Sequence, residues 1–340
     1  MKNRCCRCAK VRNKQMNNLQ EDEKWMRRCL TLGRCGRYGA PPNPMVGSVV
    51  VHSGRIIGEG YHIRCGTAHA EVNAIGAVKE ADRALLKEST LYVNLEPCSH
   101  HGRTPPCAEL IIRTGIPRVV VGCVDPFAKV EGRGIRMLRE AGIDVTVGVL
   151  EAACKHLNRR FITFHTHHRP FITLKWARSA DGFIDKWRED ATEAPAHLST
   201  QHTLMRVHRL RSLHRAILVG HGTLRLDRPT LTVRHWTGEN PLPIVLGRVA
   251  EGELPAGFEA FCDIDTMLEE LYRRGIQTLL VEGGEQTLQT FINRGLWDEA
   301  WEEQSHVKLE SGVPAPRMPI GTEHSTETLF GVNISHWRNR

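Results

Sequence analysis

The sequence predicts two α/β domains, each built on a β-sheet that is covered by helices. The chain has 340 residues, of which 41% are hydrophobic and 25% are charged, so its composition is that of a globular protein with enough length for about two domains. Short apolar runs alternate with segments of helical periodicity, which is typical of α/β layers. This alternation breaks at "HTHH", residues 165–168, and we expect the domain boundary there.

The first domain is expected over residues 17–164. Its first helix is predicted within residues 16–33, because Trp25, Met26, Cys29 and Leu30 recur at helical spacing after an acidic stretch. Strands and helices then alternate, which predicts a three-layer α/β/α arrangement. The expected strands cover 45–54, 89–98, 118–126 and 144–149, and the expected helices cover 69–78, 107–115 and 132–142.

The second domain is expected over residues 168–340, with the same kind of alternation. Apolar runs predict its strands, and segments of helical periodicity predict its helices. The expected strands cover 171–179, 215–223, 243–247 and 278–284, and the expected helices cover 202–212, 267–275 and 288–295. Beyond Pro319 the pattern indicates no further element.

Residues 1–16 are predicted to be a disordered, basic leader. Residues 1–15 contain six basic residues and no acidic one, so they account for most of the net charge of +8. The remaining chain carries only a small positive charge, which predicts no broad nucleic-acid surface. The leader also contains Cys5, Cys6 and Cys8, but no second group of metal ligands follows nearby.

The composition predicts a cytoplasmic protein with no membrane partner. There is no run of eighteen apolar residues and no apolar core of a secretory signal behind the basic amino terminus. The eleven cysteines are scattered over a long chain, which suits reduced thiols and a few metal ligands better than a disulfide scaffold.

The clearest chemical signal is the pattern "HAE" followed by "PC" and a further cysteine. His69, Cys98 and Cys107 each lie at the end of a predicted helix or strand. One imidazole and two thiolates are three zinc ligands, and the open fourth position would take water, as in a catalytic site. Glu71 lies two residues after His69 and is placed to move protons, as in zinc nucleobase deaminases.

Two alternatives to a catalytic zinc remain open at this point. A structural zinc would need a fourth protein ligand, which His100 or His101 could supply, but such a site would not need Glu71. A noncatalytic zinc scaffold would likewise tolerate the loss of Glu71.

The segment between the two cysteines, "SHHGRTPP", is longer than the two-residue spacing of deaminases that act on nucleic acids. Arg103 offers a planar guanidinium that suits a phosphate monoester. Gly102 lets the backbone approach a ligand closely. The long spacing therefore predicts a small phosphorylated substrate.

Taken together, these motifs resemble the bifunctional riboflavin-biosynthesis family, in which diaminohydroxyphosphoribosylaminopyrimidine deaminase is fused to 5-amino-6-(5-phosphoribosylamino)uracil reductase. The resemblance runs from about residue 20 to beyond residue 300. In the first half it rests on "PPNPMVGSVVV", "GEGYH", "HAEVNAI" and "EPCSHHGRTPPC". In the second half it rests on "RPFITLKWARSADGFID", "VHRLRSLHRAILVGHGTLRLDRPTLTVR" and "TLLVEGG".

The resemblance implies a cytidine-deaminase-like domain followed by a dihydrofolate-reductase-like domain. It implies one zinc ion per chain, held by His69, Cys98 and Cys107, with Glu71 as the general acid and base. The substrate-binding residues that it implies are Asn43, His62, Arg103, Arg211, Leu231, Arg234 and Glu282. The residues that it implies for binding NADPH are Ala177, Thr223, Asp227 and Gly284.

The implied reactions are consecutive steps on 2,5-diamino-6-(5-phosphoribosylamino)pyrimidin-4(3H)-one: zinc-dependent hydrolytic deamination, then NADPH-dependent reduction of the ribosyl group to ribityl. The resemblance also implies a homo-oligomer, a dimer through the reductase domain. One departure is that His197 stands where many relatives have Trp. The alternatives are a single-step deaminase with a degenerate reductase half and a nucleic-acid deaminase.

Overall fold

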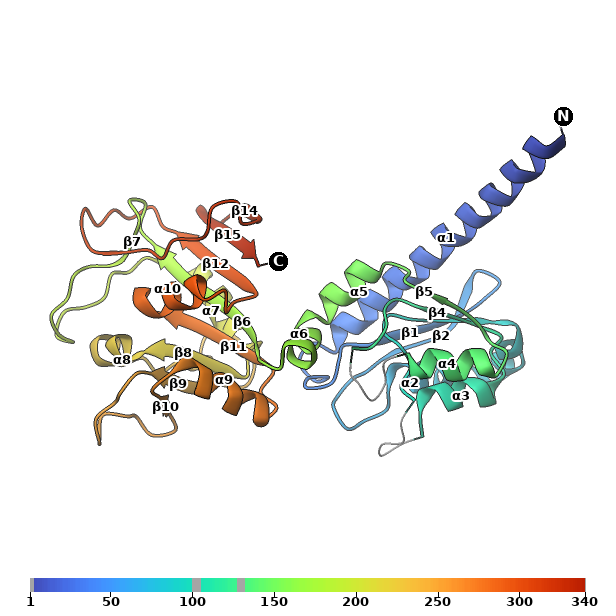
Figure 1. The fold of residues 1–340 in the computed structure, drawn as a ribbon, viewed down its shortest axis with the longest axis horizontal. Coiled ribbons are helices and arrows are strands. Elements are labelled where there is room, and N and C mark those ends of the chain that lie inside the picture. Colours follow the sequence, from blue (N-terminus) through green and yellow to red (C-terminus); the bar gives the residue numbers. More distant parts are fainter. Residues whose placement is uncertain (1–2, 100–104, 127–131, 340) are drawn as a thin grey trace. The chain divides into compact units, whose positions relative to one another are not determined.

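The computed structural model describes residues 3–99, 105–126 and 132–339, with side chains from residue 18 onward. The chain divides into two compact units, Met1–Thr166 and His167–Arg340. The division lies within the boundary region that the break at 165–168 predicts. Each unit has its own main sheet (Figure 1).

Unit 1 has a five-stranded sheet with the order β2-β1-β3-β4-β5. β1 is antiparallel to both neighbours, whereas β3, β4 and β5 are parallel. The strands are β1 (Gly47–His52), β2 (Arg55–Tyr61), β3 (Thr90–Val93), β4 (Arg118–Val121) and β5 (Asp144–Val147). The helices are α1 (Asn3–Cys35), α2 (Ala70–Gly76), α3 (Cys107–Thr114), α4 (Arg133–Glu140), α5 (Glu151–Leu157), α6 (Arg159–His167) and the 3-10 helix η1 (Glu80–Glu88).

The sheet of unit 1 is covered on both faces, as the alternating pattern predicts. One core packs α2, α3 and α4 against the sheet through residues such as Ala74, Ile111 and Leu138. The other packs α1 and α5 through residues such as Met26 and Leu157. Figure 1 shows these two helix layers on opposite sides of the strands. Because successive strand residues face opposite sides, the apolar runs of β1, β3 and β4 supply both cores.

The leader differs from the sequence-based expectation, because α1 begins at Asn3 and includes residues 3–16, which were predicted to be disordered. Residues 3–32 contain neither proline nor glycine, and they are rich in Arg, Lys and Gln, which have high helix propensity. Helix propensity alone can therefore extend α1 toward the amino terminus. The sequence-based expectation had looked for apolar residues at helical spacing, and residues 3–16 do not show them.

Unit 2 has an eight-stranded sheet with the order β10-β9-β8-β11-β6-β12-β15-β14. The strands from β10 to β12 in this order are parallel, and β15 and β14 are antiparallel. The bounds of these strands are β6 (Phe171–Arg178), β8 (Ala216–Gly220), β9 (Leu242–Leu246), β10 (Glu259–Phe261), β11 (Thr278–Gly283), β12 (Glu299–Gln304), β14 (His324–Leu329) and β15 (Val332–Arg338). A separate two-stranded sheet pairs β7 (Phe183–Asp185) with β13 (Val313–Pro314). The helices are α7 (Gln201–Ser212), α8 (His221–Asp227), α9 (Ile264–Arg273) and α10 (Glu285–Asn293).

Helices also cover both faces of the parallel part of this sheet. α9 and α10 contribute Met267 and Phe291 to one core, and α7 and α8 contribute Leu210 and Leu224 to the other. β14 and β15 lie beyond Pro319, where the sequence indicated no element, and they extend the sheet through β12.

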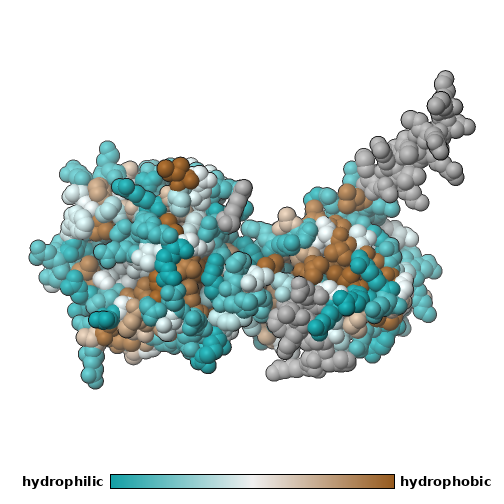
Figure 2. Space-filling model, viewed as in Figure 1, coloured by the Kyte–Doolittle hydropathy of each residue, from teal (hydrophilic) through white to brown (hydrophobic). Residues whose placement is uncertain are grey.

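Hydrophilic side chains predominate on the visible surface of each unit, with hydrophobic residues in smaller groups between them (Figure 2). Among the described residues, no helix combines the length and the apolar character needed to cross a membrane.

Candidate functional site

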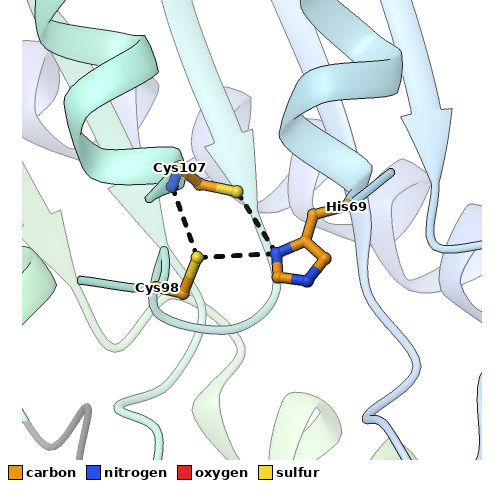
Figure 3. A group of neighbouring side chains, drawn as sticks. All are labelled: His69, Cys98 and Cys107. Atoms are coloured by element: carbon orange, nitrogen blue, oxygen red, sulfur yellow. Dashed lines mark hydrogen bonds between the residues drawn. The ribbon is translucent and has the colours of Figure 1, made fainter. Parts of the chain in front are cut away.

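His69, Cys98 and Cys107 come together at one end of the unit 1 sheet (Figure 3). His69 is the N-cap of α2, Cys98 follows β3, and Cys107 is the first residue of α3. The Nδ1 atom of His69 lies 3.5 Å from Cys98 Sγ and 3.4 Å from Cys107 Sγ. The three possible ligand atoms all lie within 4.8 Å of one another.

This group fits a tetrahedral zinc ion in both chemistry and spacing. Zn–S and Zn–N bonds of about 2.3 and 2.05 Å at a tetrahedral angle place sulfur and nitrogen about 3.6 Å apart. The two Nδ1–Sγ separations, 3.5 and 3.4 Å, are close to that value. Three protein ligands are also the number found in catalytic zinc sites, which keep a fourth position open.

The thiol of Cys98 is held in a state that favours metal binding. A hydrogen bond from the Cys107 thiol, together with interactions from His69, lowers the pKa of Cys98, and the same hydrogen bond raises the pKa of Cys107. The backbone N–H of Cys107 also donates to Cys98 Sγ over 3.3 Å. Because the thiolate is the form that binds metals, the start of α3 prepares Cys98 as a ligand.

Glu71 lies beside this group on the first turn of α2, and its carboxyl group interacts with Cys107. The side chain is buried, and burial raises the pKa of Glu71 to about 7, with the nearby Cys98 acting in the same direction. A carboxyl group with a pKa near neutrality can both accept and donate a proton, which is what a general acid and base requires.

Two residues expected to bind substrate, Asn43 and His62, lie next to the ligand group. The ring of His62 meets that of His69 edge-on, with centroids 5.4 Å apart. His62 Nδ1 lies 3.1 Å from the carbonyl oxygen of Ala68, and His62 Nε2 lies 3.1 Å from Asn43 Nδ2. Burial lowers the pKa of His62, so a neutral ring donates to Ala68 and accepts from Asn43. The third, Arg103, lies outside the described residues.

The residues expected to bind NADPH lie at or after the carboxyl ends of parallel strands in unit 2. β8, β11 and β6 are parallel neighbours, so their carboxyl ends meet at one edge of the sheet. Ala177 lies near the end of β6, Thr223 follows β8, and Gly284 follows β11. This edge is where open α/β sheets bind ligands.

Arg211 and Glu282 form a buried ion pair. Arg211 Nε and Nη2 donate to the two carboxylate oxygens of Glu282 over 2.9 and 2.7 Å. Arg211 Nη1 also donates to the carbonyl oxygen of Thr232 over 3.0 Å, in the segment that carries Leu231 and Arg234. Burial acts to raise the pKa of Glu282, but the charge and hydrogen bonds of Arg211, together with the charge of Lys175, hold this pKa below its usual value.

The cofactor residues expected from the resemblance are only partly brought together. A Cβ atom added to Gly284 would lie 3.2 Å from Thr223 Oγ1, so these two residues are adjacent. Asp227 forms an ion pair with Arg188, whose side chain is nearly buried between Asp185 and Asp227. His197 is exposed.

Sequence reasoning missed two residues that support this second site. Arg188 lies in a loop whose pattern gave no sign of a buried charge. His208 lies one helical turn before Arg211 on α7, and its Nδ1 accepts a hydrogen bond from the backbone N–H of Arg234 over 2.8 Å. Burial lowers the pKa of His208 to about 4, so it is a neutral acceptor. Its helical spacing from Arg211 was the signal that could have found it.

Family models match both units. Residues 19–123 match the cytidine and deoxycytidylate deaminase zinc-binding region, and residues 170–301 match the RibD C-terminal domain. Together with the α/β architecture of both units, these matches confirm the predicted deaminase-like first domain and reductase second domain.

Several known proteins are similar to the chain over most of its length. The riboflavin biosynthesis protein RibD of Synechocystis is 43% identical over 274 residues, which cover 77% of this chain and 72% of that protein. The RibD protein of Aquifex aeolicus is 38% identical, covering 82% and 85%. The crystal structure of a diaminohydroxyphosphoribosylaminopyrimidine deaminase/5-amino-6-(5-phosphoribosylamino)uracil reductase from Thermotoga maritima is 33% identical, with a TM-score of 0.84 over 95% of this chain and 100% of that chain.

Proposed function

Because this chain belongs to the RibD family of bifunctional riboflavin-biosynthesis enzymes, we propose that unit 1 deaminates and unit 2 reduces one phosphorylated pyrimidine intermediate in turn. The chain carries both the deaminase and the reductase domain, so a single-step deaminase or a nucleic-acid deaminase is not favoured. The observation that carries the proposal is the compact His69–Cys98–Cys107 group with the buried Glu71 beside it.

In the first step, water replaces the 2-amino group of the pyrimidine and ammonia leaves. One zinc ion per chain, held by His69, Cys98 and Cys107, would supply an activated water at neutral pH. Glu71 takes a proton from that water and delivers it to the departing amine. Asn43 and His62 orient the substrate, and Arg103 binds its phosphate by charge-assisted hydrogen bonds.

In the second step, the ribosyl carbon attached to nitrogen accepts a hydride, and the ribose opens to ribityl. Ala177, Thr223, Asp227 and Gly284 hold NADPH at the carboxyl edge of the sheet, where the amide groups at the start of α10 can meet a dinucleotide phosphate. The substrate lies against Leu231 and is bound by the charged residues Arg211, Arg234 and Glu282. The protein's contribution is to orient hydride donor and acceptor.

Three finer points also belong to this proposal. NADPH rather than NADH is the hydride donor, which the basic residues Arg225 and Arg228 beside Asp227 support. The enzyme acts in the cytoplasm on small molecules, with no nucleic-acid partner. It assembles as a homo-oligomer, a dimer through the reductase domain.

The test is to supply zinc-loaded protein with the diaminopyrimidine phosphoribosyl substrate, with and without NADPH, and to identify products by mass spectrometry. Without NADPH, the product should have lost an amino group and gained an oxygen. With NADPH, it should also have gained two hydrogens. The proposal would be wrong if no ammonia were released, or if already deaminated substrate were not reduced.

A further inference from the structure

Glu96 lies two residues before the ligand Cys98. It is buried, since only 4% of the residue's surface is exposed. One carboxylate oxygen accepts hydrogen bonds from the backbone N–H groups of Asp125 and Gly132, over 3.3 and 2.9 Å. The other accepts from Gly134 and Ile135, over 2.9 and 3.3 Å. Four N–H donors satisfy both oxygens of this buried side chain, and three of them, from Gly132, Gly134 and Ile135, belong to the start of α4.

The start of α4 also lies unusually close to the segment that leads to Cys98. A Cβ atom added to Gly134 would lie 2.0 Å from the carbonyl oxygen of Pro97 and 3.3 Å from Glu96 Oε1. Because no side chain fits in that space, glycine lets the helix touch the backbone of Pro97 directly.

The segment 96–98 is therefore held at both of its ends. Glu96 fixes one end to α4, and the hydrogen bond from the Cys107 N–H to Cys98 Sγ fixes the other end to the start of α3. α3 and α4 pack against each other, so the two attachment points belong to one layer. A shift of Glu96 would be passed along two residues of backbone to the Cys98 sulfur.

We propose that Glu96 is a positioning residue for the zinc site, which anchors the Pro97–Cys98 segment to α4 and thereby fixes the Cys98 sulfur relative to His69 and Cys107. This inference rests on the proposed zinc site. Replacing a group that hydrogen-bonds to a metal ligand and orients it typically lowers metal affinity 10- to 100-fold. Glu96 acts on Cys98 through the backbone, and we expect an effect at the lower end of this range.

The first test is Glu96→Gln in the full-length, zinc-loaded chain. Glutamine keeps the size of the side chain but turns an NH₂ group toward N–H donors, so hydrogen bonds to α4 are lost. Zinc transfer to a chromogenic chelator should become about tenfold faster. The matched control is Glu140→Gln, an exposed residue at the other end of α4, which should release zinc at the wild-type rate.

The second test leaves the charge in place and separates the two backbones. Alanine favours helix over glycine, yet Gly134→Ala places a methyl group against the Pro97 carbonyl and should also release zinc faster. Gly76→Ala is the control, because its Cβ would meet nothing within 4 Å.

A third variant separates positioning from a general loss of stability. Ile111→Val, in the core of unit 1, should lower the melting temperature and leave the zinc release rate unchanged. If Glu96→Gln does not fold, Gly134→Ala decides the question. Wild-type zinc release by the folded Gly134→Ala and Glu96→Gln variants, or equal acceleration by Ile111→Val, would overturn the role of Glu96. A wild-type chain that binds no zinc would instead refute the proposed function.

Discussion

Removing either side of the ion pair between Arg211 and Glu282 should destabilise unit 2, and Glu282→Gln should cost more than Arg211→Gln. The two side chains are only 12% and 9% exposed, and two hydrogen bonds join them. Breaking a buried ion pair by removing one partner costs about 3–5 kcal/mol, because the remaining charge is left without compensation.

The asymmetry follows from Lys175, which lies close enough to Glu282 for its ammonium group to interact with that carboxylate. In parallel β6 and β11, Leu174 pairs with Val281, so Lys175 and Glu282 are the next residues on neighbouring strands. Arg211→Gln leaves Glu282 facing Lys175, an opposite charge, and should cost about 3 kcal/mol. Glu282→Gln leaves the cations Arg211 and Lys175 close together, with Glu303 as the remaining carboxylate near Lys175, and should cost about 4–5 kcal/mol.

Thermal unfolding followed by tryptophan fluorescence measures this difference, because six of the seven tryptophans lie in unit 2. A unit of this size loses about 2–4 °C in Tm per kcal/mol. We therefore expect a fall of about 6–12 °C for Arg211→Gln and of about 8–20 °C for Glu282→Gln, with the latter larger in the same experiment. Equal shifts, or a larger shift for Arg211→Gln, would show that Lys175 does not share the charge of Glu282.

Three further predictions concern both units. Glu71→Gln should slow ammonia release about 10²- to 10⁴-fold with zinc retained, while the reduction of already deaminated substrate stays near the wild-type rate; a loss of both activities in folded protein would contradict separate sites. Cys98→Ser and Cys107→Ser should each lower the zinc content measured by atomic absorption, whereas Cys154→Ser should not; full zinc in the first two would mean that other side chains bind it. His208→Gln should make the stability of unit 2 less dependent on pH. The folded pKa of His208 is about 4, below about 6.5 in the unfolded chain, so the unfolded state binds more protons between these values and the wild-type chain loses stability as the pH falls from 6.5 to 4. Parallel stability curves for variant and wild type over that range would refute this.

Local sequence patterns predicted most of the fold, because buried parallel strands such as β8 and β11 are short apolar runs between helices. They did not predict β2, α5, α6, β10 or β12. Two further misses are the helical residues 3–16 and the pair β14–β15. In the first case, the helix propensity of the residues is enough to form the helix, and no apolar face is required. In the second, residues His324–Thr328 of β14 are all exposed, so hydrophobic alternation gives no signal, and the strand is defined by its pairing with β15.

The candidate zinc ligands could be predicted because they belong to a recognisable motif. His69 and Cys107 stand at the starts of α2 and α3, and Cys98 lies five residues after β3. The residues around them could not be predicted, since their roles depend on contacts between distant segments. Glu96 meets the start of α4 some 36 positions later, from Gly132 onward, and His208 meets Arg234 after 26 positions. No local pattern contains either pairing.

The three candidate zinc ligands are separated along the chain by 29 and 9 positions, so an ion bound by them would cross-link separate segments of unit 1. A ligand that binds only the folded state stabilises it by mass action, by about 2.7 kcal/mol when its free concentration is 100 times its Kd. Among the described residues of unit 2, no such group of ligands occurs. The free zinc concentration would therefore change the stability of the deaminase unit through this group of side chains.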